Sequence, residues 1–368
     1  MIIMECECNQ KIKTLKVETE RAIYEIEFGQ IQIEITGRCN MRCQHCRAIN
    51  ELRKDMPLGQ IVKIIQFARQ FSANYKEIIV SGGEPLLHSQ FYEVLKSIKN
   101  NGGKFITLTT NGSLLTPNHL DFIQQLKFQR FMLSISLDSL DDMEHDNFRN
   151  HIGAYNKAIA AIRMMVKKAE PNLIASIRMT LRPEQISEME KMIDFAYNLG
   201  CQRVSFSGIH PAGKAINKPD LWMTKEQKYS FLNKIYEFRK KYPKSFRIET
   251  NDPLRCLIRN SSDIGNDNEI IFDGCSAAAV TFNVSVNGDM TPCALMNLPI
   301  MNVFDISIEE IAKKYQESEI VKNMLDMKLT GKCGSCSKKY QCGGCRARAM
   351  IRNNHYLAED PDCWLEIV

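Results

Sequence analysis

Three cysteines near the start of the chain have a spacing suited to metal chemistry. The segment ITGRCNMRCQHC places Cys39, Cys43 and Cys46 in the pattern C-x3-C-x2-C, directly after an apolar β-branched run at 31–36. Three thiolates at this spacing can bind three irons of a [4Fe–4S] cluster and leave the fourth iron without a protein ligand. An open metal position is a place where a substrate or cofactor can bind.

A second group of cysteines lies in the last quarter of the chain. Its members are Cys275, Cys293, Cys333, Cys336, Cys342, Cys345 and Cys363. The N-terminus has only four apolar residues before Glu5, fewer than the roughly 7–15 of a secretory signal core. No apolar run reaches the roughly 18–20 residues of a membrane span. We therefore expect a cytoplasmic protein without a membrane partner, in which clustered thiols bind metal rather than form disulfides.

Composition excludes several classes of protein. The 368 residues are 44% apolar and 25% charged, with 12 Pro and 19 Gly, which excludes a disordered, collagen-like or coiled-coil chain. The net charge of +5 is spread over 48 basic and 43 acidic residues. Since the two signs are so evenly balanced, the charge does not favour a nucleic-acid partner.

Between residues 31 and 245, short apolar runs alternate with segments of helical period, which is typical of βα units on a parallel sheet. The predicted strands are 31–36, 77–81, 105–110, 131–137, 173–181 and 202–207. The predicted helices are 57–73, 88–101, 117–126, 154–169, 184–199 and 225–241. Six units are too few for a closed eight-stranded barrel, so we expect an α/β fold, a partial (β/α)6 TIM-like barrel. Its functional residues should lie on the loops that follow the strands.

The flanking segments are predicted to differ from the barrel. Residues 12–29 alternate apolar and polar side chains, which favours a small hairpin within an N-terminal segment 1–30. The region 246–368 is predicted to form a cysteine-rich iron–sulfur domain after the barrel at 31–245. Within it, Asn287-Gly288 predicts a hairpin turn, and Ser307 with Glu310 predicts a capping box at the start of a helix over 307–325. Because regular structure is sparse there, metal would supply stability.

The first cysteine group and several strand-end motifs together resemble the radical S-adenosylmethionine (SAM) enzymes. In that family the open iron binds the amino and carboxylate groups of SAM. After the second predicted strand, Gly82, Gly83, Glu84 and Pro85 look like the family's GGEP motif, whose backbone and glutamate contact the amino group of SAM. Glycines at such a position let the backbone approach a ligand closely.

Further matches to the family follow in order along the chain. Asn111 lies in a TNG segment after the third strand, and Ser136 and Asp138 lie in an SLD segment at the end of the fourth. The resemblance implies that Ser136 and Arg149 hold the carboxylate of SAM, that Asp138 lies near its ribose, and that His45 stacks near its adenine. The alternative is a structural zinc site, which His45 or His88 would have to complete.

The second cysteine group resembles the SPASM extension of radical SAM enzymes, which carries two auxiliary [4Fe–4S] clusters. The spacing departs from the usual one by a single residue, since only Gly343 and Gly344 separate Cys342 from Cys345. By order, the resemblance implies an inner cluster on Cys275, Cys293 and Cys345, and an outer cluster on Cys333, Cys336, Cys342 and Cys363. The alternative is two zinc sites, for which seven thiols would need a histidine such as His355.

Counting ligands leaves four of the fourteen cysteines unassigned. Full ligation of three clusters needs eleven cysteines, and the motifs supply ten. Cys256 can complete the inner cluster, or that cluster can keep an open iron that binds substrate. We expect Cys201 to be a buried apolar residue, and Cys6 and Cys8 to have no catalytic role. The basic residues Lys332, Lys338, Lys339, Arg346, Arg348 and Arg352 either offset cluster charge or form a solvated face.

The resemblance implies three [4Fe–4S] clusters, SAM, and a 5′-deoxyadenosyl radical that removes hydrogen from an unactivated carbon. We expect a peptide substrate that receives a thioether or carbon–carbon crosslink, with a separate recognition protein or direct docking of the leader. An electron donor such as flavodoxin or ferredoxin is expected. Two alternatives stay open: a haem-pathway-like decarboxylase of tetrapyrrole side chains, and a non-catalytic iron–sulfur electron carrier. No catalytic acid or base is identified.

Overall fold

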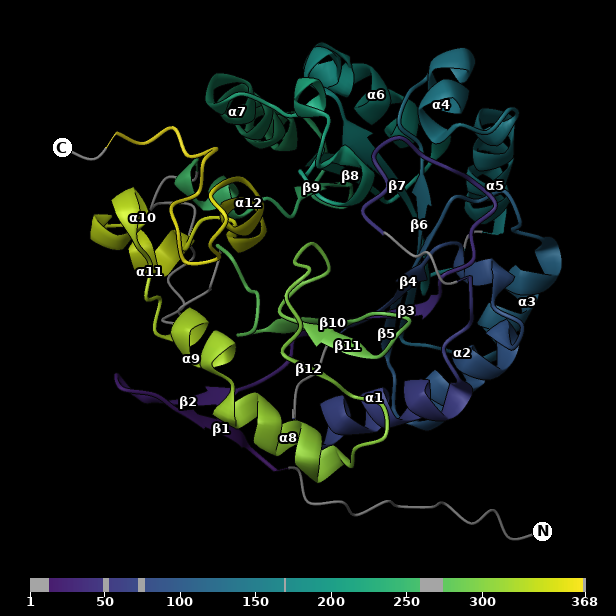
Figure 1. Ribbon diagram of the computed structural model, residues 1–368. Helices are drawn as coiled ribbons and strands as arrows, with labels where there is room; N and C mark the ends of the chain where they lie inside the picture. Colours follow the sequence, from purple (N-terminus) through teal and green to yellow (C-terminus); the bar gives the residue numbers. More distant parts are fainter. Residues whose placement is uncertain (1–12, 49–52, 72–76, 169, 259–273, 367–368) are drawn as a thin grey trace, which may run out of the picture.

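The computed structural model describes residues 13–48, 53–71, 77–168, 170–258 and 274–366. Its centre is a curved sheet, seen in Figure 1 with helices on its outer side. In the described part of the chain the strand order is β12 (Met301–Asn302), β11 (Asp289–Thr291), β10 (Thr281–Val284), β3 (Gln30–Thr36), β4 (Glu77–Gly82), β5 (Phe105–Thr110), β6 (Arg130–Ser136), β7 (Leu173–Leu181), β8 (Arg203–Gly208) and β9 (Arg247–Thr250). Neighbouring strands from β10 through β9 are parallel.

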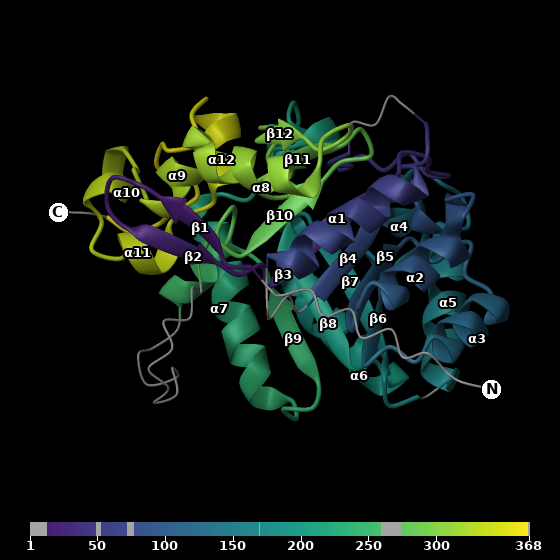
Figure 2. The same cartoon turned by 90° about the horizontal axis from the view of Figure 1, so that it is seen from below.

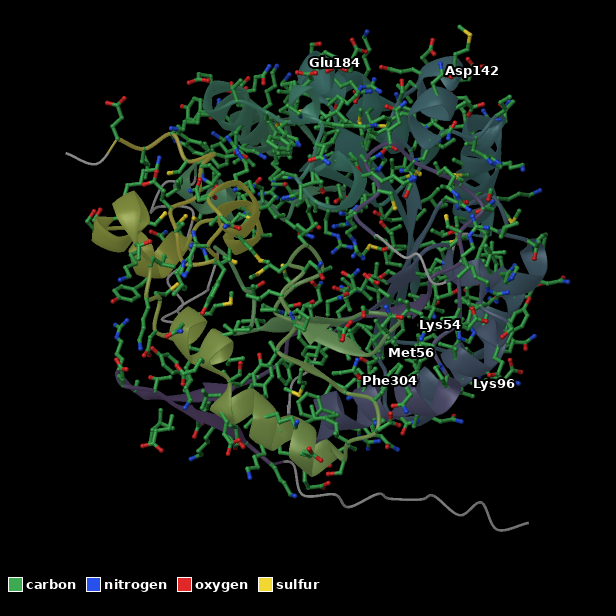
Figure 3. The ribbon with its side chains drawn as sticks, in the orientation of Figure 1. Lys54, Met56, Lys96, Asp142, Glu184 and Phe304 are labelled. Carbon is green, nitrogen blue, oxygen red and sulfur yellow. The ribbon has the colours of Figure 1, made fainter. Side chains whose placement is uncertain are left out.

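Helices follow the strands and cover the sheet, and most of them bury an apolar face against it. They are α1 (Leu58–Gln70), α2 (Phe91–Asn100), α3 (Pro117–Gln125), α4 (Asp142–Arg149), α5 (Ala154–Lys168), α6 (Met189–Leu199) and α7 (Lys225–Lys241). Short 3₁₀ helices lie at Pro85–Leu87, Pro183–Glu188, Gly213–Ala215, Pro219–Leu221 and Pro253–Leu257. Figure 3 shows Asp142, at the start of α4, and Glu184 on the outer rim of this layer.

The predicted fold class is confirmed, and each of the six predicted strands lies within one residue of an observed one. The structure adds one parallel strand, β9, that the sequence pattern did not predict, and it pairs β10, the first strand of the predicted hairpin, in parallel with β3. β9 has four residues of mixed polarity, too few for a clear alternation of apolar residues, so pairing with β8 makes it a strand.

Helix α4 was also not predicted, because its sequence DMEHDNFR is almost entirely polar. Its ends are nevertheless well specified: the Asp141 side chain accepts a hydrogen bond from the Glu144 N–H, and Asn150 ends the helix in the left-handed conformation, at φ +48°. Caps of this kind favour a helix where hydrophobic pattern does not. The helix carries Arg149 toward the strand ends.

The flanking segments pack on the barrel rather than apart from it. Strands β1 (Leu15–Glu18) and β2 (Ile23–Ile26) form the predicted hairpin. Figures 1 and 2 both place it beside α8 (Ile308–Glu317) and α9 (Glu319–Leu325). The rings of Phe28 and Phe282 meet edge to face, with centroids 4.7 Å apart. One apolar core therefore joins the hairpin, the barrel and the C-terminal region.

The C-terminal region keeps two of its predicted features. Gly288 turns the hairpin between β10 and β11 with a φ of +89°, and the Ser307 side chain caps the next helix. The predicted helix 307–325 is divided into two at Ser318, whose side chain caps the second. The short helices α10 (Gly331–Ser335), α11 (Lys339–Cys342) and α12 (Arg346–Arg352) were not predicted.

A buried group of charges fastens the C-terminal region to the barrel. Arg348 on α12 is 1% exposed and donates to Asp252, after β9, and to Asp360, both at 2.7 Å. Lys228 on α7 lies 2.9 Å from the same Asp252 carboxylate. Arg346 and Arg348 are both buried, so the prediction of a solvated basic face is wrong for these two residues. A buried cation of this kind is retained only where carboxylates surround it.

Candidate active site

The first cysteine loop lies at the carboxyl ends of the parallel strands, held against the end of β4. The Gly83 N–H donates to the Thr36 carbonyl at 2.7 Å, and the Glu84 N–H donates to the Arg38 carbonyl at 2.8 Å. A Cβ on Gly83 would lie 2.2 Å from the Arg38 carbonyl oxygen. Only glycine allows this approach, so the glycines of the GGEP segment set the position of the cysteine loop.

Glu84 is fully buried and connects three segments of the site. Its carboxylate accepts from the Thr110 hydroxyl at 2.7 Å and from the Asn111 N–H at 2.8 Å. The Asn111 side chain donates in turn to Asn40, between Cys39 and Cys43, at 2.9 Å. Burial raises the pKa of Glu84, against the effect of these hydrogen bonds. The structure therefore brings the GGEP segment, the TNG segment and the cysteine loop together.

Asp138, in the SLD segment, is connected to the cysteine loop through Arg149. Arg149 Nε donates to Asp138 Oδ2 at 2.6 Å, and Arg149 Nη1 lies 3.8 Å from the Cys43 sulfur. Asp138 also accepts from the Thr180 N–H at 2.9 Å. Burial opposes ionisation of both groups, but each charge stabilises the other: the pKa of Asp138 is lowered and that of Arg149 is raised. Ser136 is buried at the end of β6.

His45 lies between Cys43 and Cys46 and packs on α4. Its ring stacks on Phe148 with centroids 4.4 Å apart and an interplanar angle of 15°. Burial lowers the pKa of His45 to about 4, so the ring is neutral near pH 7. Its Nδ1 is buried without a hydrogen-bond partner in the described structure. Since such atoms are rare in folded proteins, this nitrogen fits contact with a bound group.

Two residues that the sequence did not single out connect the loop to the rest of the site. Arg47 donates to Glu34 Oε1 at 2.6 Å and to the Ala294 carbonyl, beside Cys293, at 2.9 Å. Gly213 has a φ of +57°, and a Cβ there would lie 2.3 Å from the Cys46 carbonyl oxygen. The segment after β8 therefore closes directly on the cysteine loop.

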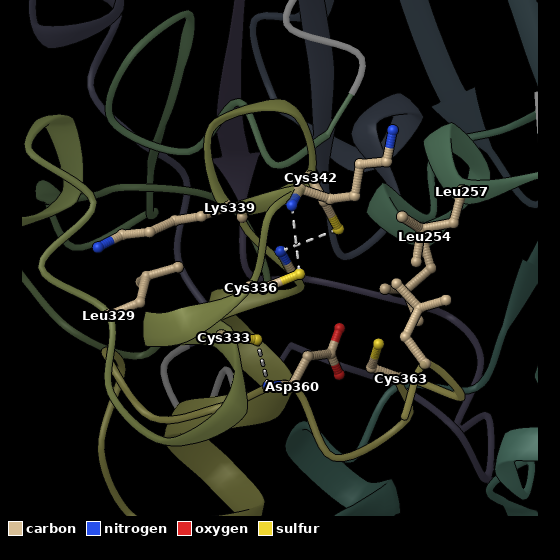
Figure 4. A pocket seen from close by; sticks show the side chains of 13 residues that line it. Leu254, Leu257, Leu329, Cys333, Cys336, Lys339, Cys342, Asp360 and Cys363 are labelled. Carbon is tan, nitrogen blue, oxygen red and sulfur yellow. Dashed lines mark hydrogen bonds between the residues drawn. The ribbon is translucent and has the colours of Figure 1, made fainter. Parts of the chain in front are cut away.

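The four cysteines predicted for the outer cluster line one small cavity, shown in Figure 4. Backbone N–H groups of Asp360, Lys338 and Gly344 lie 3.4 Å from the sulfurs of Cys333, Cys336 and Cys342, respectively. Backbone donors of this kind stabilise negative charge on sulfur, as thiolate ligands require. Leu254, Leu257, Leu329 and Leu365 complete the wall. The donor set fits an iron–sulfur cluster.

The cysteines predicted for the inner cluster are electrostatically coupled to one another. Burial, together with the charge of Cys275, raises the pKa of Cys293 to about 11 and that of Cys345 to about 12. The Cys345 N–H donates to Asp360 Oδ2 at 2.7 Å. Asp360 thus contacts both sets, because its own N–H faces the Cys333 sulfur. Among the described residues, no three His, Cys, Asp or Glu side chains are close enough to hold one metal ion.

The remaining cysteines have different surroundings. Cys256, in the 3₁₀ helix Pro253–Leu257, shares a hydrogen bond with Cys342, a member of the predicted outer set. Its ligation of the inner cluster stays a prediction. Cys201 is buried in the apolar core, as predicted. Cys6 and Cys8 lie outside the described residues. None of the described helices is both long enough and apolar enough to span a membrane.

Comparisons with known proteins agree with this arrangement. Residues 33–196 match the model of the radical SAM superfamily. An AdoMet-dependent heme synthase of Methanosarcina barkeri is 28% identical over 343 residues, which are 90% of this chain and 94% of that protein. The subtilosin biosynthesis protein AlbA of Bacillus subtilis is 22% identical over 334 residues, 88% of this chain and 68% of that one.

Two solved structures share the fold over most of both chains. SuiB of Streptococcus suis, bound to its precursor peptide SuiA, has a TM-score of 0.74 at 17% identity and covers 93% of this chain and 77% of SuiB. The structure of anSMEcpe with bound AdoMet has a TM-score of 0.67 at 17% identity and covers 91% and 93%. At these identities the likeness establishes the fold alone.

Proposed function

We propose that the protein is a radical SAM enzyme, as the match of residues 33–196 to that superfamily indicates, and that it abstracts hydrogen from a peptide and so modifies a ribosomally made substrate. The observation that carries the proposal is the meeting of the cysteine loop, Glu84 and the Asp138–Arg149 pair at the carboxyl ends of the parallel strands. A non-catalytic electron carrier would not need these strand-end side chains. An enzymatic function therefore explains more of these residues than electron transfer alone does.

Cys39, Cys43 and Cys46 would hold the cluster, and the neighbouring strand ends would hold SAM. Cluster and SAM together supply one-electron cleavage of SAM to methionine and a 5′-deoxyadenosyl radical. Glu84 and the backbone of the GGEP segment would bind the SAM amino group, while Ser136 and Arg149 would bind its carboxylate. His45, Asp138 and Asn111 would complete the site. The closed packing around Gly83 and Gly213 would exclude water.

We propose that the C-terminal region is a SPASM extension with two auxiliary clusters. Its support is the division of seven cysteines into two groups, one around a single cavity and the other coupled through Cys275. Fully loaded protein would carry about twelve irons per chain. Cys256 would serve the inner cluster only by leaving its present contact with Cys342.

The proposed peptide substrate is supported by relatives of this fold whose names refer to peptides, AlbA and the SuiB–SuiA complex. A second candidate is oxidative decarboxylation of a tetrapyrrole side chain. It is favoured by heme synthases that are 25–28% identical over 90% of this chain. The peptide proposal also includes a cytoplasmic location, an electron donor such as flavodoxin or ferredoxin, and a separate peptide-recognition protein.

The substrate test compares the two candidates on one preparation. Anaerobically reconstituted protein is incubated with SAM, dithionite and either a synthetic peptide that contains cysteine and acidic residues or an iron tetrapyrrole with free propionates. Mass spectrometry of each substrate reads out the reaction. Loss of hydrogen from the peptide supports the proposal. Loss of carbon dioxide from the tetrapyrrole, with an unchanged peptide, supports the second candidate instead.

Gly213 gives a prediction about the packing of the cysteine loop. In Gly213→Ala, the new Cβ would overlap the Cys46 carbonyl, and we expect 5′-deoxyadenosine formation to fall roughly a hundredfold, because a shift of about 1 Å is enough for such a loss. Gly153→Ala is the matched control, since Gly153 also has a positive φ, +78°, but nothing within 4 Å of its Cβ position. Equal rates in the two variants would contradict the prediction.

A further inference from the structure

Arg178 is a charged residue in the middle of the apolar strand β7. Its neighbours Ile177 and Met179 are almost fully buried in the core. Since successive side chains of a strand point to opposite faces, Arg178 faces the interior of the barrel instead. It lies beside Ser136 of β6 and Ser205 of β8 in the strand register. A guanidinium is therefore held at the level of the proposed SAM site.

The other arginines around Arg178 each have a carboxylate of their own. Arg149 pairs with Asp138, Arg47 with Glu34 and Arg203 with Glu249, each at 2.6 Å. The described residues give Arg178 no ion pair. Its one recorded hydrogen bond runs from Nη2 to the Ser207 hydroxyl, at 3.4 Å. Among the described residues, Arg149, Arg47 and Arg203 thus each form a close ion pair and Arg178 does not, although the charge of Asp138 acts on it as well.

The surroundings make this charge unfavourable unless an anion binds. Burial and the nearby charges of Arg203 and Arg47 lower the pKa of Arg178 to about 10, and the charge of Asp138 only partly opposes them. Arg178 is partly buried, and a desolvated charge without an ion-pair partner is unfavourable. The five N–H donors of a guanidinium match the two oxygens of a carboxylate. An anion bound here would neutralise the uncompensated charge.

The charge of Arg178 acts on residues on two sides of the proposed active site. It acts on His45, in the first cysteine loop, and on His210, which follows β8 and is also influenced by Arg348 of the C-terminal region. His210 Nδ1 is buried without a hydrogen-bond partner in the described structure. A group bound at Arg178 would therefore lie near the proposed SAM residues, since Arg178 is beside Ser136 in the strand register.

We infer that Arg178, supported by the Ser207 hydroxyl, binds a carboxylate of the substrate. The inference rests on the proposed function and adds the chemical class of the substrate to it. An acidic side chain of a peptide and a propionate of a tetrapyrrole carry the same group. The carboxylate of SAM is assigned to other residues, Ser136 and Arg149. An effect of Arg178 on SAM itself would therefore contradict the inference.

The experiment compares wild type with Arg178→Met, Arg178→Lys and the control Arg130→Met. Arg130 lies at the opposite end of β6 and contacts Glu77. Each protein is reconstituted, and its SAM dissociation constant and its substrate-free rate of 5′-deoxyadenosine formation are measured. Binding is then measured for the same synthetic peptide, with its acidic residues intact or changed to amides, and for the iron tetrapyrrole, as free propionate or methyl ester.

We expect Arg178→Met to weaken binding of one free-acid probe roughly tenfold to hundredfold, which is the usual effect of losing a charge-assisted hydrogen bond. SAM binding should stay within about twofold of wild type, and Arg178→Lys should recover part of the loss. The amide or ester should bind all proteins equally weakly. The probe that responds identifies the source of the carboxylate.

Three results would overturn the inference. A lower affinity of Arg178→Met for SAM would show that Arg178 binds SAM rather than the substrate. Free-acid probes that bind Arg178→Met and wild type equally show that no carboxylate is held there. If neither probe binds to wild type while SAM cleavage is intact, the carboxylate assignment is removed and the radical SAM function remains. Absence of SAM cleavage by wild type is a different failure, because it removes the proposed function.

Discussion

Replacement of Arg348 by Met is expected to lower the free energy of unfolding by about 3–5 kcal/mol, the usual result of breaking a buried ion pair. Arg348 lies 2.7 Å from both Asp252 and Asp360 and 3.4 Å from Asp362. The variant leaves these carboxylates buried, with Lys228 still close to Asp252 and Arg352 still paired with Asp362, while Asp360 loses its ion-pair partner. Urea unfolding at constant pH measures the change.

We expect the loss of Arg348 to disturb the two predicted cysteine sets as well. Asp360 accepts from the Cys345 N–H and presents its own N–H to Cys333, so its displacement should lower the iron content of the C-terminal region. Lys241→Met is the control, because its pair with Glu190 is exposed and should change stability by less than about 1 kcal/mol. Similar unfolding curves for the two variants would contradict the structural role of Arg348.

The second large effect is expected from Arg149. In Arg149→Met, Asp138 loses the partner that holds its pKa down, and we expect a loss of about 3–5 kcal/mol in stability. The proposed contact with the SAM carboxylate is lost as well. The dissociation constant of SAM should rise roughly tenfold to hundredfold, as measured by equilibrium dialysis under anaerobic conditions.

A double variant separates the two roles of Arg149. Asp138→Asn together with Arg149→Met removes the unpaired buried charge, so most of the stability should return. SAM binding should not return, because the guanidinium is still absent. Recovery of SAM affinity in the double variant would show that Arg149 acts only by supporting Asp138, and Ser136 would then be left as the proposed carboxylate ligand.

The strands and the main site could be predicted from the sequence because both depend on short segments. Runs such as IQIEIT and FITLTT have the β-branched residues of buried parallel strands. Motifs directly after such strands must meet, since the carboxyl ends of parallel strands lie at one edge. The contacts of Glu84 with Asn111, and of Arg149 with Cys43, follow this rule.

The remaining features depend on contacts between distant segments. Nothing local relates Lys228 to Asp252 and Arg348, which come together only when the C-terminal region packs on the barrel. Strand β10 likewise exists because β3 offers it a partner. Arg178 did leave a local signal, since a lone charge inside LIASIRMTL must face away from the apolar side of the strand. The sequence prediction did not single out Arg178, and its lack of an ion-pair partner among the described residues depends on where distant carboxylates lie.

The most direct test of the central claim is the formation of 5′-deoxyadenosine. Wild type and Cys43→Ala are reconstituted anaerobically, given dithionite and SAM, and assayed by chromatography for the nucleoside. Cys201→Ala is the control, because Cys201 is buried in the core away from the predicted cysteine sets. The account predicts product from wild type and Cys201→Ala and none from Cys43→Ala. No product from wild type, or equal product from Cys43→Ala, would contradict it.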